Sequence, residues 1–145
     1  MKNLNLFKNF NKNPKYIPYG RQNITNDDIK AVVQVLKSEF LTQGNILKDF
    51  EKEISKKVCS KYSIAVNSAT SALHIACLAL GLKKGDYLWT TPITFVASAN
   101  CGIYCGAKID FVDVDQDSAL ISIRELEKKL IRAKIENKLP KIVIP

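Results

Sequence analysis

The stretch Asn67-Ser68-Ala69-Thr70-Ser71-Ala72-Leu73-His74 lies between a short apolar run and a longer one. Residues 63–66 before it predict a buried strand, and apolar residues after it recur at helical spacing until Gly81. A turn of small hydroxyl and amide residues at a helix start presents backbone N–H groups, hydroxyls and the positive end of the helix dipole to one point. The turn has two interpretations: it binds an anionic phosphate, or Asn67, Ser68 and Thr70 only cap the helix.

Strands and helices alternate along the rest of the chain. Two amphipathic helices are expected before the turn, at 25–38 and 46–57. After it, we expect strands at 87–91, 108–114 and 141–144 and helices at 96–105 and 123–136. This alternation predicts an α/β fold with a mainly parallel sheet flanked by helices on both faces, and a ligand site at the carboxyl ends of the strands.

Some of these elements carry expectations about burial. The strand at 108–114 is nearly continuously apolar, which is typical of a strand buried on both faces. The helix at 46–57 has an apolar face that should pack on a sheet, and the helix at 25–38 should have a buried stripe. The residues of the two faces are Leu47, Phe50, Ile54 and Val58 in the later helix and Ile29, Val32, Val33 and Leu36 in the earlier one.

Composition and charge exclude several classes of protein. The chain has 145 residues, 46% apolar and 25% charged, enough for one domain with a core. The apolar run 73–82 is interrupted and is shorter than the roughly 20 residues of a membrane span, and residues 1–15 contain no apolar signal-peptide core. The net charge of +8 comes from scattered basic residues without interleaved aromatics. We expect a cytoplasmic protein with no membrane or nucleic-acid partner, with residues 1–16 as a flexible extension and 17–145 as the folded part.

The cysteines and the single histidine do not form a metal site in the sequence. Cys59, Cys77, Cys101 and Cys105 contain no CxxC pair and have no metal-ligand spacing with His74. Buried, unpaired thiols are the expected outcome, and His74 is expected to be a packed or partly exposed helix residue. The sequence therefore predicts no metal.

Two further stretches are candidates for ligand contact. One is 90–100, Thr-Thr-Pro-Ile-Thr-Phe-Val-Ala-Ser-Ala-Asn, where Phe95 either belongs to the core or covers a flat ring bound near the first turn. The other is Phe40-Leu41-Thr42-Gln43-Gly44, which is either a linker between helices or a loop that faces a ligand.

These residues resemble those of a known family. The stretches 67–76, 90–100 and Phe111-Val112-Asp113-Val114-Asp115 are similar, in the same order, to the N-terminal part of the DegT/DnrJ/EryC1/StrS sugar aminotransferases. The resemblance runs from about Ile17 to Pro145. It implies that residues 17–145 are the truncated N-terminal portion of the large, pyridoxal phosphate (PLP)-binding domain in the fold that PLP-dependent transferases share with aspartate aminotransferase. Pro-Tyr-Gly-Arg-Gln-Asn-Ile, which begins at Pro18, and the Phe-Leu-Thr-Gln-Gly loop are most similar to the pseudaminic acid branch.

That resemblance implies an activity and a set of site residues. The branch aminates C4 of UDP-4-keto-6-deoxy-N-acetyl-altrosamine, with glutamate as the amino donor, and members of the family bind the cofactor at a homodimer interface. Pyridoxal 5'-phosphate would be held at its phosphate by the Ala69 backbone, Thr70 and Ser71. Phe95 would stack on its ring, Ser98 and Asn100 would support the pocket, and Thr42, Gln43 and Gly44 would lie near the UDP-sugar substrate.

The resemblance also indicates what these residues lack. In the family, the Asp that pairs with the pyridine nitrogen and the Schiff-base Lys follow a proline that matches Pro145, so this chain carries no catalytic residue by position. We therefore expect the N-terminal piece of a longer enzyme, inactive alone. A sugar dehydratase of the same family, or a noncatalytic module that associates with a full-length subunit, remains an alternative. A nucleotide-binding Rossmann domain is disfavoured because no G-x-G-x-x-G follows a strand.

Overall fold

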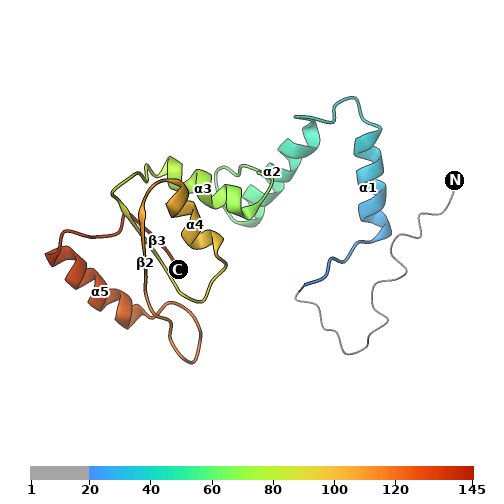
Figure 1. Cartoon of the computed structure of the whole chain (residues 1–145). Coiled ribbons are helices and arrows are strands. Elements are labelled where there is room, and N and C mark those ends of the chain that lie inside the picture. The colour runs from blue at the N-terminus through green and yellow to red at the C-terminus, as the bar shows by residue number, and fades with distance from the viewer. Residues whose placement is uncertain (1–19) are drawn as a thin grey trace. The chain divides into compact units, whose positions relative to one another are not determined.

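The computed structural model describes residues 20–145 (Figure 1). The chain divides into two compact units, with the boundary between Ser63 and Ile64. The expected extension at 1–16 and the start of the resemblance at Ile17 lie outside the described residues. Each unit is described by itself below.

The N-terminal unit contains the helices α1 (Asn26–Leu36) and α2 (Asn45–Lys57), as the spacing predicts. Thr25 begins α1 with a reciprocal capping box: its Oγ1 accepts from the N–H of Asp28 at 3.3 Å, and the Asp28 carboxylate accepts from the N–H of Thr25 at 2.7 Å. The expected burial of the α1 stripe is wrong, because its four side chains are 41 to 62% exposed. The apolar face of α2 is exposed as well. Periodicity marks which face is apolar, but an element of matching shape must cover that face to bury it.

The C-terminal unit is built on a parallel sheet of three strands, β1 (Tyr87–Thr90), β2 (Lys108–Phe111) and β3 (Ile142–Ile144). Their order is β2-β1-β3, and Leu88 of the central strand pairs with Ile109 on one side and Ile142 on the other. The predicted α/β class with a parallel sheet is confirmed, and the helices α3 (Ala69–Ala79), α4 (Ala97–Tyr104) and α5 (Ile123–Ile135) flank the strands.

Two strand predictions are wrong in instructive ways. Residues 63–66 form no strand, and Ile64 is 79% exposed. A strand needs a neighbouring strand to pair with its backbone N–H and C=O groups. In the described residues, the segment 63–66 is not part of the sheet. The strand expected at 108–114 ends at Phe111 and lies at an edge of the sheet. It is not buried on both faces, because Lys108, Asp110 and Phe111 are exposed.

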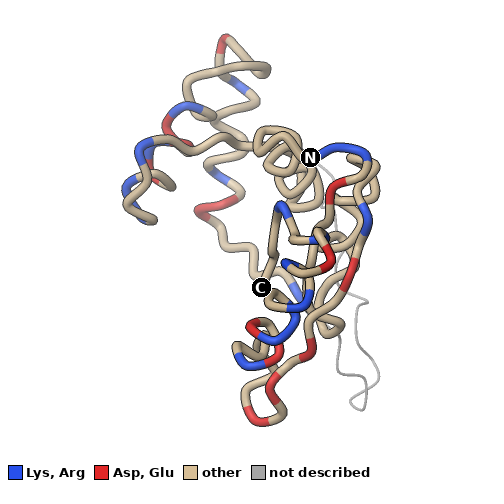
Figure 2. The backbone as a smooth tube through the Cα atoms, turned by 90° about the vertical axis from the view of Figure 1, so that its left-hand side faces the viewer, with Lys and Arg blue, Asp and Glu red and all other residues tan. Residues whose placement is uncertain are grey.

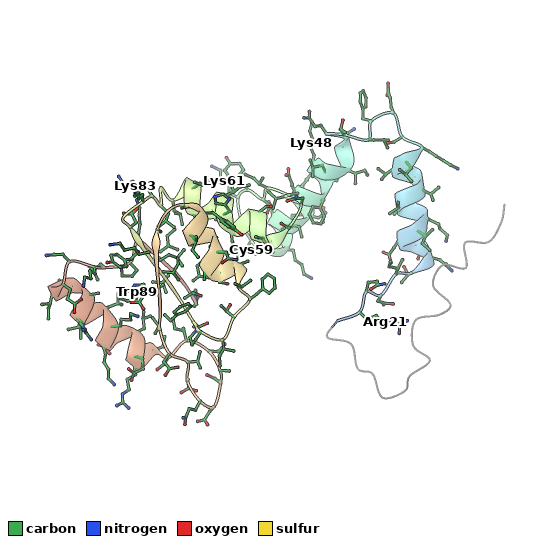
Figure 3. All side chains as sticks on the ribbon, viewed as in Figure 1. Arg21, Lys48, Cys59, Lys61, Lys83 and Trp89 are labelled. Carbon is green, nitrogen blue, oxygen red and sulfur yellow. The ribbon has the colours of Figure 1, made fainter. Side chains whose placement is uncertain are left out.

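Side chains alternate across β1 and separate two small cores. Leu88 packs with Cys77, Leu82 and Cys101 beneath α3 and α4, whereas Trp89 packs with Val112 and Ala133 beneath α5. Figure 1 shows α5 on one side of the strands and α3 and α4 on the other, and Figure 3 shows Trp89 on the side of α5. The helices therefore cover both faces of the sheet, as the alternating pattern predicts.

A glycine sets the distance between α4 and the sheet. A Cβ atom at Gly102 would lie 2.5 Å from Cδ1 of Ile109 and 3.2 Å from Cβ of Leu88. Contacts this short force neighbouring atoms to shift. The absence of a side chain at Gly102 thus allows α4 to lie directly against β1 and β2.

The cysteines behave as expected at three of their four positions. Cys77 and Cys101 are buried, Cys105 is partly buried, and all four thiols are free. Burial, and then the neighbouring Cys101 thiol, raises the pKa of Cys77 to about 12. Cys59 is exposed, which corrects the prediction: it follows the end of α2 in the left-handed conformation (φ 53°), and this turns it out of the helix.

The remaining sequence expectations concern His74, metals and membranes. His74 is partly buried on α3, with its ring edge-to-face with Tyr104 of α4 at 5.3 Å between centroids. Among residues 20–145, no group of three or more His, Cys, Asp or Glu side chains is arranged to hold a metal ion. In the same residues, no helix combines the length and the apolar character needed to cross a membrane.

A lysine at the start of β3 ties three segments of the C-terminal unit together. The Lys141 ammonium donates to the carbonyl of Gly81 at 2.6 Å and to the Asp86 carboxylate at 3.3 Å. The same carboxylate accepts from the backbone N–H of Lys83 at 3.0 Å. Desolvation favours a higher pKa for Asp86, but these two hydrogen bonds and the lysine charges outweigh it and lower the pKa below its ordinary value.

Asp86 should give the unit a pH-dependent part of its stability. A carboxyl whose pKa is lower in the folded state stabilises the fold above the unfolded-state pKa of about 4 and loses that contribution as the pH falls through the folded-state value. We expect Asp86→Asn to lower the thermal midpoint at pH 6, and the gap between wild type and variant to close below pH 4. Thermal melts by circular dichroism test this. Asp117→Asn, which removes an exposed carboxylate, is the control, and a gap that persists at low pH would contradict the assignment.

Candidate functional site

The turn at the start of α3 is organised by its own polar side chains. Ser68 is the N-cap, and its Oγ accepts from the backbone N–H of Ser71 at 3.1 Å. The Ser71 hydroxyl donates to Oδ1 of Asn67 at 2.7 Å and lies 3.0 Å from the Ser68 hydroxyl. The capping interpretation is therefore confirmed for Ser68, with Asn67 joined to the cap through Ser71.

Capping leaves two donors of this turn without a protein partner. Among residues 20–145, the backbone N–H groups of Ala69 and Thr70 donate to no protein acceptor. The first turn of α3 carries no acidic side chain, so nothing there repels an anion. The positive end of the helix dipole and two free N–H groups form an arrangement suited to a phosphate. Capping and anion binding are thus compatible in this turn.

The stretch that follows β1 presents an aromatic ring to solvent. The Phe95 side chain is 71% exposed, so within the C-terminal unit Phe95 is no core residue. Ser98 in the first turn of α4 is only 8% exposed, and its Oγ lies 3.2 Å from Oγ1 of Thr94. Asn100 is partly buried one half-turn further along α4. Of the two predicted support residues, Ser98 thus contacts the segment that carries the exposed Phe95 ring, and Asn100 lies on the same helix.

The predicted site residues are divided between the two units. Ala69, Thr70 and Ser71 start α3, Ser98 and Asn100 lie in α4, and these two helices pack against each other on one face of the sheet. The three predicted substrate residues, Thr42, Gln43 and Gly44, lie in the N-terminal unit, in the loop between α1 and α2.

The α1–α2 loop forms a groove within its own unit. Gln43 and Gly44 line a groove of about 710 Å³ together with apolar side chains from the loop and from α2. A Cβ at Gly44 would lie 2.8 Å from the carbonyl oxygen of Phe40, so the loop needs a glycine there. The absence of a side chain at Gly44 thus allows the close approach of the loop backbone to the Phe40 carbonyl.

Another groove lies beside α5, and no motif in the sequence indicates it. Its volume is about 600 Å³, and four cationic and four anionic side chains line it. Several of them pair: Lys129 with Asp110 at 2.7 Å, Lys128 with Glu125 at 2.7 Å and Arg132 with Glu136 at 2.8 Å. Figure 2 shows both signs of charge interspersed along this helix. The groove therefore carries no excess of one charge that would favour an anionic ligand.

Sequence reasoning missed two hydroxyls next to the candidate site. Thr94 pairs with Ser98, as described above, and Thr90 is fully buried at the end of β1 with no hydrogen-bond partner for its Oγ1. The four-residue spacing of Thr94 and Ser98 was the available signal. This spacing alone does not show that the two hydroxyls meet, because Thr94 lies before the helix, in a segment without regular structure.

Known proteins resemble the chain in both sequence and structure. The model of the DegT/DnrJ/EryC1/StrS aminotransferase family matches residues 22–145. The UDP-4-amino-4,6-dideoxy-N-acetyl-beta-L-altrosamine transaminase of Campylobacter jejuni subsp. jejuni serotype O:23/36 (strain 81-176) is 42% identical over 116 residues, which make up 80% of this chain and 30% of that protein.

Two solved structures illustrate the likeness of fold. A DegT DnrJ EryC1 StrS aminotransferase from Brucella abortus aligns with a TM-score of 0.75 at 29% identity, over 81% of this chain and 32% of the other. GDP-4-keto-6-deoxymannose-3-dehydratase with a trapped PLP-glutamate geminal diamine aligns with a TM-score of 0.72 at 26% identity, over 78% of this chain and 31% of the other.

These matches agree with the three ordered motifs and with the parallel sheet. The chain spans about 30% of the length of the curated relative described above. The family match covers nearly all of the described residues. The chain therefore belongs to the DegT/DnrJ/EryC1/StrS aminotransferase family.

Proposed function

We propose that this chain contributes the phosphate-binding part of the PLP site of a nucleotide-sugar aminotransferase. The observation that carries the proposal is the pair of free N–H groups at Ala69 and Thr70 in a turn without acidic side chains. The residues fit the cofactor at a second point, because the exposed Phe95 offers an aromatic face to a flat ring. When bound, PLP supplies the electron sink for exchange of an amino group.

The residues of this chain act by binding and orienting. Ala69, Thr70 and Ser71 hold the phosphate, Phe95 covers one face of the ring, and Ser98 and Asn100 support the segment behind it. Thr42, Gln43 and Gly44 lie toward the sugar substrate. The lysine that the resemblance places beyond the matched segment completes the reaction, so residues 1–145 are inactive alone.

The substrate is a UDP-linked 4-keto-6-deoxy amino sugar and the donor is glutamate, in a cytoplasmic pathway for bacterial surface sugars such as pseudaminic acid. This finer assignment is supported by the 42% identity to the Campylobacter jejuni transaminase. The complete enzyme acts as a homodimer. The similarity to a dehydratase supports the alternative activity, removal of a sugar hydroxyl.

A comparison of two ligands tests the phosphate site. We expect the purified chain to bind pyridoxal phosphate, followed by cofactor absorbance in a titration. Pyridoxal has the same ring without the phosphate. It should bind at least tenfold more weakly, because it cannot accept the charge-assisted hydrogen bonds that the α3 turn donates to the phosphate. If the chain bound the two ligands equally, or bound neither of them, the proposed site would be rejected.

Reconstitution tests the activity. The chain is mixed with a polypeptide that carries the part of the Campylobacter jejuni relative beyond the matched residues, and UDP-4-keto sugar and glutamate are added. An amino sugar product supports the transaminase, whereas a deoxygenated product without amine supports the dehydratase. Co-purification with a full-length relative and no turnover in any mixture would favour the noncatalytic module.

A further inference from the structure

Ser98 holds the backbone just before α4 through two separate contacts. Its backbone N–H donates to the carbonyl of Phe95 at 3.0 Å, and its Oγ lies 3.2 Å from the Thr94 hydroxyl. Ser98 itself is fixed because it is buried in the first turn of α4. The dipeptide Thr94-Phe95 is thus held at its side chain and at its backbone by one buried residue. We call this arrangement the Ser98 clasp.

The start of α4 has no polar N-cap side chain. Its N-cap is Val96, whose side chain accepts no hydrogen bond. A polar N-cap side chain normally fixes the direction from which the chain enters a helix. In α4 the hydroxyl of Thr94, two residues before the N-cap, takes over that task through Ser98.

The clasp matters because little packing holds the Phe95 side chain, which is 71% exposed. The ring is largely exposed, so its direction depends on the backbone that carries it. A ring that must meet a flat ligand binds more tightly when it is already held in place, because less conformational entropy is lost on binding. Thr91 adds a weaker restraint earlier in the segment, since its Oγ1 donates to the carbonyl of Ile93 at 3.3 Å.

We propose that Thr94 is a positioning residue that holds Phe95, through the Ser98 clasp, in place for stacking on the flat ring of the cofactor. This inference rests on the proposed function for the identity of the ring. Thr94 itself touches no ligand in this proposal. Its hydroxyl acts only through Ser98, and its effect on binding must pass through Phe95.

Two variants of Thr94 separate the hydroxyl from the shape of the side chain. Thr94→Val keeps the volume and removes the hydroxyl, and Thr94→Ser keeps the hydroxyl. In the chain without ligand, we expect the Ser98 amide to exchange hydrogen about fivefold faster in Thr94→Val, which corresponds to the loss of one neutral hydrogen bond. Thr94→Ser should stay within about twofold of wild type. Hydrogen exchange with mass spectrometry of peptides that cover 93–99 measures this.

Binding of pyridoxal phosphate gives the second readout. The dissociation constant should rise about fivefold in Thr94→Val and be restored in Thr94→Ser. In a Phe95→Ala background, Thr94→Val should change it by less than about twofold, because the residue through which Thr94 acts is gone. A purely structural role would weaken binding equally in both backgrounds.

The outcomes distinguish this inference from the proposed function. Unchanged exchange in Thr94→Val, or an equal loss of affinity with and without Phe95, overturns the role of Thr94 while the cofactor site stands. If the wild-type chain binds no pyridoxal phosphate, the proposed function fails and the cofactor role of Thr94 fails with it. The exchange data then show whether the Ser98 clasp itself exists.

Discussion

Leu88→Ala should lower the free energy of unfolding of the C-terminal unit by about 2–5 kcal/mol. Leu88 is fully buried in the central strand and packs with Cys77, Leu82 and Cys101. The cavity left by truncation closes poorly because its walls are a paired strand and the backbone of α4, which already lies in close contact at Gly102. Urea denaturation followed by far-UV circular dichroism measures the change.

The matched control removes the same atoms from an exposed position. Leu120 is 70% exposed in the loop before α5, so Leu120→Ala should change the free energy of unfolding by less than about 0.5 kcal/mol. If the two variants lost similar stability, Leu88 would not be the centre of a packed core.

Ser71→Asp should reduce affinity for pyridoxal phosphate at least 100-fold while leaving the fold intact. A carboxylate at this position faces the expected phosphate, and juxtaposed like charges cost several kcal/mol, with about 1.4 kcal/mol per tenfold in affinity. The same carboxylate lies in the first turn of α3, where a negative charge is favourable by about 0.3–1 kcal/mol. Loss of the hydroxyl that donates to Asn67 opposes this gain, so stability should change little while affinity falls. Cofactor titration and a thermal melt of the same sample measure both.

Ser122→Asp provides the comparison for this charge change. Ser122 is the N-cap of α5, where Asp is also a good cap, and it lies outside the proposed site. We expect it to leave pyridoxal phosphate binding unchanged. Normal binding by Ser71→Asp would show that the phosphate does not bind at the start of α3.

The sequence predicted those parts of the fold that local chemistry determines. The helices α1 and α5 begin within one residue of the predicted starts at 25 and 123. The side chains of their N-caps, Thr25 and Ser122, bond to residues within the first turn. Whether an apolar helix face is buried depends on which element packs against it, and the periodicity of one helix does not contain that information. For this reason the apolar stripe of α1 was identified correctly as a face but wrongly as buried, and residues 63–66 have the composition of a strand but no partner strand.

In the candidate site, too, only the features that depend on neighbouring residues in the sequence could be predicted. The turn at Asn67–Ser71 could be predicted because a cap and an anion site use the same small polar residues. The contact between Thr94 and Ser98 could not, although the start of α4 was predicted within one residue, because it depends on the path of the irregular segment before the helix, which no local pattern specifies. Whether Thr42, Gln43 and Gly44 act on a ligand depends on contacts that form after folding, so local sequence does not decide it.

The packing of Trp89 has a spectroscopic consequence. It is the chain's only tryptophan, it lies in the core beneath α5, and the Lys129 ammonium is 5.0 Å from the centre of its ring. Tryptophan fluorescence of this protein, excited at a wavelength that the five tyrosines do not absorb, therefore reports on one face of the sheet alone. Detachment of α5 would expose the indole ring to water and remove the neighbouring Lys129 ammonium, so the emission spectrum would change. Loosening of α3 or α4 on the opposite face would leave the spectrum largely unchanged.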